Sequence, residues 1–151
     1  MDTFDIIFRL GAAALIGGAV GLNRDLHRKP SGLRTLSLVG LGSALAVLAA
    51  AGDAPDPNAV SRVLQGLLTG IGFLGAGVIV RDASSNKVHG LTTAAAIWLT
   101  ACLGAVCGLG AWRLVIVACV ILAIVLVVGG RFEKAVHKRL SGDATNGDGH
   151  E

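Results

Sequence analysis

The residues that could do chemistry in this chain of 151 residues are few, and the most suggestive pattern is a glycine-rich run. Residues 70–75 read Gly-Ile-Gly-Phe-Leu-Gly, the GxGxxG pattern that cradles a pyrophosphate when it follows a strand and opens a helix. Here the run lies inside an uncharged stretch, and residues 90–96 offer no carboxylate to bind a ribose. We therefore expect no nucleotide and no other cofactor.

The cysteines and histidines do not form a pattern typical of a metal or catalytic site. Cys102, Cys107 and Cys119 lie in uncharged stretches without CxxC spacing. His27, His89 and His137 fall in separate polar segments, so their spacing does not suit a shared metal ion. No nucleophile stands beside a candidate base. We expect no metal ligand and no catalytic residue, and hence a protein that is not an enzyme.

Two Arg-Asp pairs are the strongest remaining candidates. Residues 18–25 match residues 75–82 at four of eight positions, and each copy ends in Arg-Asp and is followed by a polar loop and Gly-Leu-x-Thr. A parallel internal repeat with its axis along the membrane normal would explain the match, and coincidence in a Gly/Ala-rich chain is the alternative. The candidate functional residues are Arg24, Asp25, Arg34, Arg81, Asp82, Thr92 and Thr93.

The sequence leaves the ligand of these residues open. Ser31 is a plausible N-cap for the helix that follows, and helix N-termini near Arg34 favour an anion such as a lipid phosphate. Asp25 and Asp82 stand near helix C-termini, where a cation could be held. The simplest alternative is that each Arg-Asp pair anchors a helix at the membrane interface.

The elements that must position these residues follow from the distribution of charge. Hydrophobic residues make up 53% of the chain, charged residues only 15%, and the mean hydropathy is +0.70, which excludes an ordinary soluble domain. Backbone groups must be paired within hydrocarbon, so the long uncharged runs predict helices. We expect an all-α bundle of five transmembrane helices in domain 1–130, with spans at 4–22, 35–51, 63–80, 91–108 and 112–128.

The basic residues predict how the spans are oriented. Ten Lys and Arg fall on one side and three, at 9, 62 and 113, on the other, which puts the C-terminus in the cytoplasm and the N-terminus outside. Arg9 lies one turn inside the first span, where Asp5 can partner it. Residues 131–140 predict an amphipathic helix on anionic headgroups, and 141–151 a disordered tail. The thirteen basic residues form no stripe with aromatics, so the bilayer, not nucleic acid, is the expected partner.

The 22 glycines predict where helices pack. Small residues four apart let helix backbones approach closely in lipid. The density of glycines at 70–77 also predicts a third span that is kinked or partly unwound and lies at the centre of the bundle. The expected packing glycines are Gly17, Gly21, Gly66, Gly70, Gly72, Gly75, Gly77, Gly104 and Gly108.

Four ordered motifs give the chain a family resemblance. Gly-Leu-Asn-Arg-Asp at 21–25, Pro-Ser-Gly-Leu-Arg-Thr at 30–35, residues 70–79, and Gly-Leu-Thr-Thr-Ala-Ala at 90–95 with Trp98 resemble the MgtC/SapB family over about residues 5 to 128. The resemblance implies a bacterial inner-membrane protein linked to magnesium homeostasis at low magnesium, one that regulates other membrane machines such as ATP synthase and does not pump magnesium.

The departures from the family pattern concern single positions and length. Asn23 stands where an acidic residue is common, and Leu36 where His is common. Only 21 residues follow Gly130, where larger members carry a cytoplasmic ACT-like domain. We expect a short, SapB-type modulator of membrane energetics or of a partner membrane complex, whose partner is another membrane protein or a second copy of the chain. The alternative is a transporter or channel for a divalent cation or small solute.

Overall fold

The computed structural model describes residues 1–52, 56–81 and 88–143 and contains five helices in those ranges. They are α1 (Thr3–Leu26), α2 (Leu33–Ala51), α3 (Pro57–Val78), α4 (Leu91–Leu109) and α5 (Trp112–Asp143). The helices α1 to α4 are long and apolar enough to cross a membrane, and α5 carries an apolar stretch at Trp112–Val128. The prediction of an all-α, multi-pass membrane protein is confirmed.

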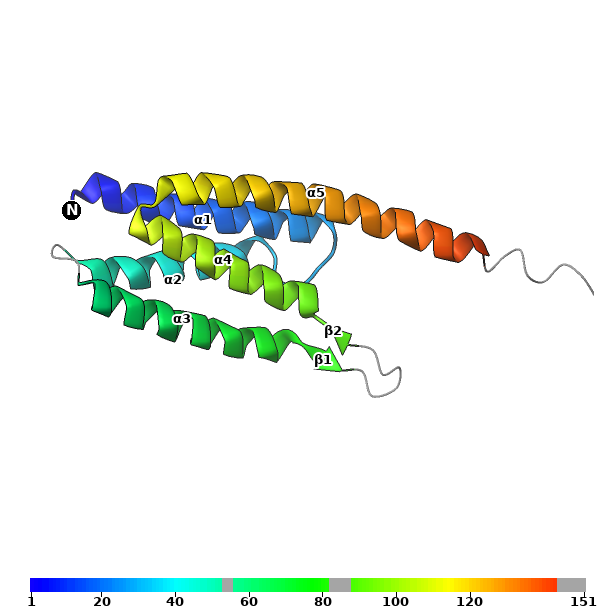
Figure 1. Cartoon of the computed structure of the whole chain (residues 1–151), viewed down its shortest axis with the longest axis horizontal. Coiled ribbons are helices and arrows are strands. Elements are labelled where there is room, and N and C mark those ends of the chain that lie inside the picture. Colours follow the sequence, from blue (N-terminus) through cyan, green and yellow to red (C-terminus); the bar gives the residue numbers. More distant parts are fainter. Residues whose placement is uncertain (53–55, 82–87, 144–151) are drawn as a thin grey trace, which may run out of the picture. The chain divides into compact units, whose positions relative to one another are not determined.

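The chain divides into two compact units, Met1–Val115 and Ile116–Glu151. The first holds α1 to α4 and a two-residue antiparallel pairing of β1 (Val80–Arg81) with β2 (Val88–His89) (Figure 1). The second holds most of α5, which runs through residues 131–140 without interruption and includes 141–143. The predicted short interfacial helix is thus part of a longer helix, and residues 144–151 of the predicted tail lie outside the described residues.

The core of the first unit is built by α1, α2 and α4, which meet through small residues. A Cβ on Gly17 would strike the backbone of Leu36, and a Cβ on Gly21 would lie 2.6 Å from Leu33 Cα. Between α4 and α2, a Cβ on Gly104 would lie 2.9 Å from Gly40 Cα. Backbones this close allow no side chain between them. These contacts make α1 antiparallel to α2, and α2 parallel to α4.

Helix α3 lies at the periphery of this unit, and the prediction of a central, kinked third span is wrong. It is one continuous helix, and only 11% of its most apolar 18 residues are buried, against 50% in α4. Exposure to lipid explains the continuity, because hydrocarbon gives unwound backbone no hydrogen-bond partner. A Cβ added at Gly75 would lie 3.5 Å from Ala94 Cβ, in ordinary packing contact. A Cβ added at any of the other four glycines of α3 would meet no atom within 4 Å: Gly66, Gly70, Gly72 and Gly77.

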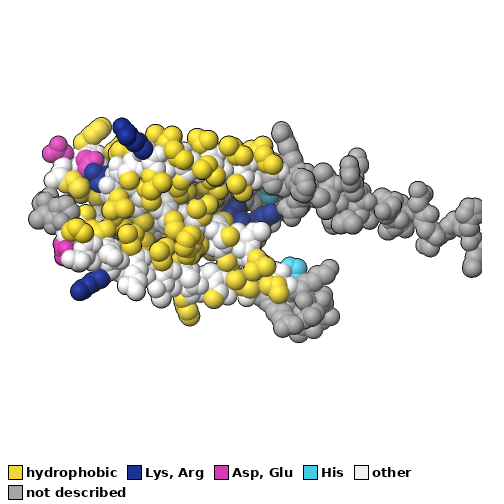
Figure 2. Space-filling view, viewed as in Figure 1, with side chains coloured by type: hydrophobic (Ala, Val, Ile, Leu, Met, Phe, Trp, Pro, Cys, Tyr) yellow, Lys and Arg dark blue, Asp and Glu magenta, His cyan; other side chains and the backbone are white. Residues whose placement is uncertain are grey.

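The surface of the helices is largely apolar, as a lipid-facing surface must be. On the face drawn in Figure 2, hydrophobic side chains cover the middle of the helices, and the visible carboxylates lie at one end. Large exposed side chains include Phe4, Leu15 and Phe73, the last 80% exposed. Apolar exposure on this scale would be an aggregation hazard in water and is the normal state in a bilayer.

The arginines of the two Arg-Asp pairs lie in different secondary structure. Helix α1 continues to Leu26 and so includes Arg24 and Asp25. Helix α3 ends at Val78, and Arg81 lies in β1. The turn after α1 leads directly into α2, whereas β1 and β2 separate α3 from α4. The corners that suggested the internal repeat are therefore not equivalent in local structure.

Candidate functional site

The centre of the candidate site is Arg24, a cation buried between helices. Its side chain is in the last turn of α1 and is only 5% exposed. Nε and Nη2 donate to the carbonyl oxygen of Pro30 at 3.0 and 2.7 Å, Nη1 donates to that of Thr92 at 3.3 Å, and Nη2 also donates to Thr93 Oγ1. One guanidinium thus ties α1 to the turn at 27–32 and to the first turn of α4.

Arg24 has no carboxylate within ion-pair distance among the described residues. Its charge is stabilised by oriented dipoles: the Pro30 carbonyl, the polar groups of α4, and the negative end of α1, in whose last turn it lies. A planar fork with five donors suits such a cluster of acceptors better than an ammonium would. The arrangement therefore depends on arginine specifically, and not only on a positive charge.

Asp25, the neighbour of Arg24, points to a different helix. Its Oδ2 accepts a hydrogen bond of 2.9 Å from the backbone N–H of Leu33, the first residue of α2. The N-cap position of α2 is Gly32, and a Cβ there would collide with the Asp25 carboxylate. The prediction that Ser31 caps α2 is therefore wrong: Ser31 has φ of 61° and lies in the turn. The carboxylate of Asp25, eight residues before Leu33, does the capping.

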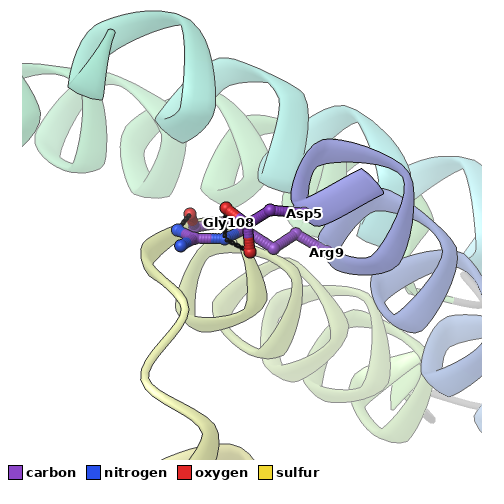
Figure 3. A network of polar contacts seen from close by, with 3 residues as sticks. All are labelled: Asp5, Arg9 and Gly108. Atoms are coloured by element: carbon purple, nitrogen blue, oxygen red, sulfur yellow. Dashed lines mark hydrogen bonds and ion pairs between the residues drawn. The ribbon is translucent and has the colours of Figure 1, made fainter. Parts of the chain in front are cut away.

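A second arginine of α1 contacts the opposite end of α4. Arg9 Nε lies 3.0 Å from both Asp5 carboxylate oxygens, and Nη1 donates to the carbonyl oxygen of Gly108 at 3.0 Å (Figure 3). That carbonyl belongs to the last turn of α4, whose terminus is negative. The partnership with Asp5 is confirmed, and the contact with α4 adds to it. The two arginines therefore hold both ends of α4 against α1.

Arg34 is separate from this network and lines a groove between α2 and α3. The groove is largely open and has a volume of about 700 Å³. Arg34 and Thr35 line it in the first turn of α2, and the remaining lining residues continue along both helices: Leu38, Val39, Gly42, Ser43, Leu67, Ile71 and Leu74. Arg34 is exposed, and no hydrogen bond or ion pair of its side chain is found within the described residues.

The structure brings together some of the sequence candidates and separates others. Arg24, Asp25, Thr92 and Thr93 meet where α1, α2 and α4 come together. Arg34 faces the α2–α3 groove. The backbone of Arg81 pairs with Val88, its side chain is not described, and Asp82 lies outside the described residues. The sequence did not predict three groups that make these contacts, because a backbone contact does not depend on a particular side chain. They are the Pro30 carbonyl, the Gly108 carbonyl and Gly40.

The contacts of the site hold helices together. Where the structure describes side chains, at 1–52, 56–79 and 88–128, no group of three His, Cys, Asp or Glu lies close enough to share a metal ion. Arg24 lies beside a hydroxyl and carbonyl oxygens, not beside a nucleophile paired with a base. One polar atom in these ranges is buried without a partner, the hydroxyl of Thr100 in the middle of α4.

The chain has clear relatives. SrpB of Synechococcus elongatus is 48% identical over 124 residues, which cover 75% of this chain and 68% of SrpB. MgtC of Salmonella typhimurium is 40% identical over 122 residues, or 81% of this chain and 51% of MgtC. YhiD of Escherichia coli K12, whose name marks it as a candidate magnesium transporter, is 40% identical over 134 residues, or 83% of this chain and 61% of YhiD. No solved structure matches the chain.

These relatives differ in how much of them the chain covers. It spans about two thirds of SrpB and about half of MgtC. Residues 10–135 match the MgtC family, a range that begins within α1, ends within α5, and includes Arg24, Asp25 and Arg34. The five apolar helices and this match agree with each other, and the chain belongs to the MgtC family of membrane proteins.

Proposed function

We propose that this chain is a non-enzymatic modulator of a partner membrane complex, resident in the bacterial inner membrane and used in adaptation to low magnesium. The observation that supports the proposal is an outward face of α3 that carries glycines at helical spacing and that α1, α2 and α4 do not cover. Gly66, Gly70, Phe73 and Gly77 recur at helical spacing on that face, and all are exposed. Gly75, on the opposite side, packs against α4.

The energetics of α3 support a partner helix. Each glycine in a helix interior costs about 1 kcal/mol relative to alanine. At Gly17, Gly21 and Gly104 close backbone approach within the chain offsets that cost, whereas at Gly66, Gly70 and Gly77 nothing in the described residues does. A helix of another membrane protein lying on this face would gain the same close approach. The proposed partner is therefore a transmembrane helix, and α3 is the element that contacts it.

The core formed by α1, α2 and α4 supports a fixed platform. Gly40 and Gly104 bring α2 and α4 into backbone contact, and Arg9 and Arg24 join α1 to both ends of α4. Alanine, serine and threonine side chains are buried in this core, together with larger ones such as Leu36. In the proposal this core holds α3 in place for its partner.

A transporter of magnesium or another divalent cation is the second candidate. The name of the relative YhiD favours it. The described residues supply little for this role, because the carboxylates of α1 are already engaged: Asp5 pairs with Arg9, and Asp25 caps α2. A cation pathway normally carries an available acidic or polar group inside the membrane.

One experiment separates the two candidates. The chain and its Gly70→Leu variant are tested for rescue of growth at low magnesium in a strain lacking the gene, and for magnesium uptake in proteoliposomes. A modulator gives rescue that Gly70→Leu abolishes and no uptake by either protein. Magnesium uptake by the purified wild-type chain would overturn the modulator and establish the transporter.

The proposal includes the orientation inferred from the basic residues, with the N-terminus outside and the C-terminus in the cytoplasm. In this orientation the end of the unit that holds Arg24 and Arg34 faces the cytoplasm, and the end with Asp5 and Arg9 faces outward. An impermeant thiol reagent added outside should label Ala54→Cys. Labelling of that position only from the cytoplasmic side would reverse the orientation.

A further inference from the structure

The groove between α2 and α3 has the features of a binding site that the proposed partner contact does not use. Its α3 lining is Leu67, Ile71 and Leu74, whose mean direction lies about a quarter turn around the helix from that of Gly66 and Gly70, at about 100° per residue. Its volume of about 700 Å³ is within the range of small-molecule sites in proteins. Both helices that form it are long and apolar enough to span a membrane, so the groove opens to lipid and not to water.

The lining of the groove is polar at one end and apolar along its length. Arg34 and Thr35 are in the first turn of α2, and the residues beyond them are mainly leucine, valine and isoleucine. Arg34 is a cation at the positive end of a helix, where like charges repel unless an anion is present. Asp25 does not supply that anion to Arg34, because its carboxylate accepts from the Leu33 N–H and forms no ion pair with Arg34 within the described residues.

The length of the groove matches one leaflet of a bilayer. Arg34 and Ser43 are nine positions apart on α2, which corresponds to about 13 Å along a helix at about 1.5 Å per residue. The hydrocarbon core of a bilayer is about 30 Å thick, so one leaflet contributes about 15 Å. Gly42, near the inner end, deepens the groove, because a Cβ there would meet no atom within 4 Å.

We propose that this groove binds one anionic phospholipid of the leaflet on the Arg34 side, with the phosphate at Arg34 and an acyl chain along α2 and α3 as far as Gly42 and Ser43. Charge complementarity selects the headgroup, and the apolar lining holds the chain. The proposal goes beyond the modulator function and does not depend on it.

The test uses the full chain reconstituted in nanodiscs of equal parts phosphatidylglycerol and phosphatidylcholine, then extracted in mild detergent and weighed by native mass spectrometry. The wild-type chain is expected to retain one phospholipid, predominantly phosphatidylglycerol. Arg34→Gln should reduce the preference for phosphatidylglycerol about tenfold or more, the effect of losing one charge-assisted hydrogen bond. Gly42→Leu should remove the retained lipid of either headgroup.

Two matched variants serve as controls. Arg28→Gln removes an exposed cation outside the groove from the turn between α1 and α2. Gly11→Leu adds the same side chain as Gly42→Leu at another helical glycine with open space around it, on α1. Both should retain lipid as the wild type does. Circular dichroism and size-exclusion elution unchanged from wild type establish that each variant is folded.

Three results would overturn the proposal. Retention of phosphatidylglycerol by Arg34→Gln at the wild-type ratio would remove Arg34 from the site. Equal loss of lipid in Gly11→Leu and Gly42→Leu would show ordinary boundary lipid. A lipid-free dimer that Gly42→Leu dissociates would show that a second copy of the chain fills the groove. None of these results bears on growth at low magnesium, so the modulator proposal stands or falls separately.

Discussion

Substituting alanine for glycine should have opposite effects on stability at two positions that look alike in the sequence. Gly104 belongs to the pair Gly104 and Gly108 on α4, and Gly70 to the pair Gly66 and Gly70 on α3, each spaced by four residues. An added Cβ at Gly104 meets the carbonyl oxygen of Gly40 and lies 2.9 Å from its Cα and carbonyl carbon. An added Cβ at Gly70 meets nothing within 4 Å.

The magnitudes follow from these contacts. At Gly70 alanine improves helix propensity without a clash, which should raise the free energy of unfolding by up to about 1 kcal/mol. At Gly104 the same gain is opposed by overpacking, which costs about 1–3 kcal/mol in well-packed interiors. The obstruction at Gly104 is backbone and cannot rotate away, so we expect the upper end of that range and a net loss of about 2 kcal/mol.

The assay is reversible unfolding of the purified chain in mixed micelles with increasing dodecyl sulfate, followed by circular dichroism. Gly104→Ala should unfold at a lower dodecyl sulfate fraction than wild type, and Gly70→Ala at the same or a higher fraction. Equal destabilisation by both substitutions would contradict the prediction, because it would mean that α3 is packed as closely as α4. Loss of growth rescue in Gly70→Ala, despite its stability, is the result expected if α3 contacts a partner.

Substitutions at three residues test the contacts of α1. Arg24→Gln removes a guanidinium that donates to three acceptors, so the free energy of unfolding should fall by about 2–3 kcal/mol. The control Arg28→Gln, in the exposed turn, should leave the free energy of unfolding within about 0.5 kcal/mol of wild type. Asp25→Ala removes the cap of α2 and should lower the free energy of unfolding by about 1 kcal/mol, whereas Asp25→Asn keeps an acceptor and should lower it less. Equal losses for the two variants in unfolding titrations would contradict the capping role. Arg9→Gln should lower the free energy of unfolding by about 1 kcal/mol, a figure discounted for the 19% exposure of the side chain. The control is Arg113→Gln, which changes an exposed arginine in the first turn of α5 and should show no comparable loss in the same titration.

The helices and their number follow from the pattern of apolar and charged residues. Hydrocarbon tolerates no unpaired backbone, so long apolar runs must be helical, and charged residues mark their ends. The predicted spans at 35–51, 91–108 and 112–128 agree with α2, α4 and the apolar part of α5 to within two residues at the bounds given. The pairing of Arg9 with Asp5 was also accessible, because residues four apart share a helix face.

The sequence did not determine what each glycine pair or each Arg-Asp pair does. Gly17 and Gly21, Gly66 and Gly70, and Gly104 and Gly108 share one spacing, yet the first and third lie in contacts with α2 and the second faces outward. Close approach requires two helices, and a glycine pattern describes only one of them. Gly40 is an example, because it contacts both Ala13 of α1 and Gly104 of α4. Its role arises only where the three helices come together, and the sequence of one helix does not contain that information.

The roles of Arg24 and Asp25 likewise follow from how the helices pack. Adjacent residues on a helix point about 100° apart, so one side chain could enter the contact with α4 while the other reached the start of α2. The acceptors for Arg24 include the backbone carbonyl oxygens of Pro30 and Thr92. Every residue type has a backbone carbonyl, so no sequence motif predicts these contacts. Sequence alone specified which segments enter the membrane, because that depends on transfer of each segment from water to lipid. The fold specified which residues meet, because close packing and hydrogen bonding depend on both partners at once.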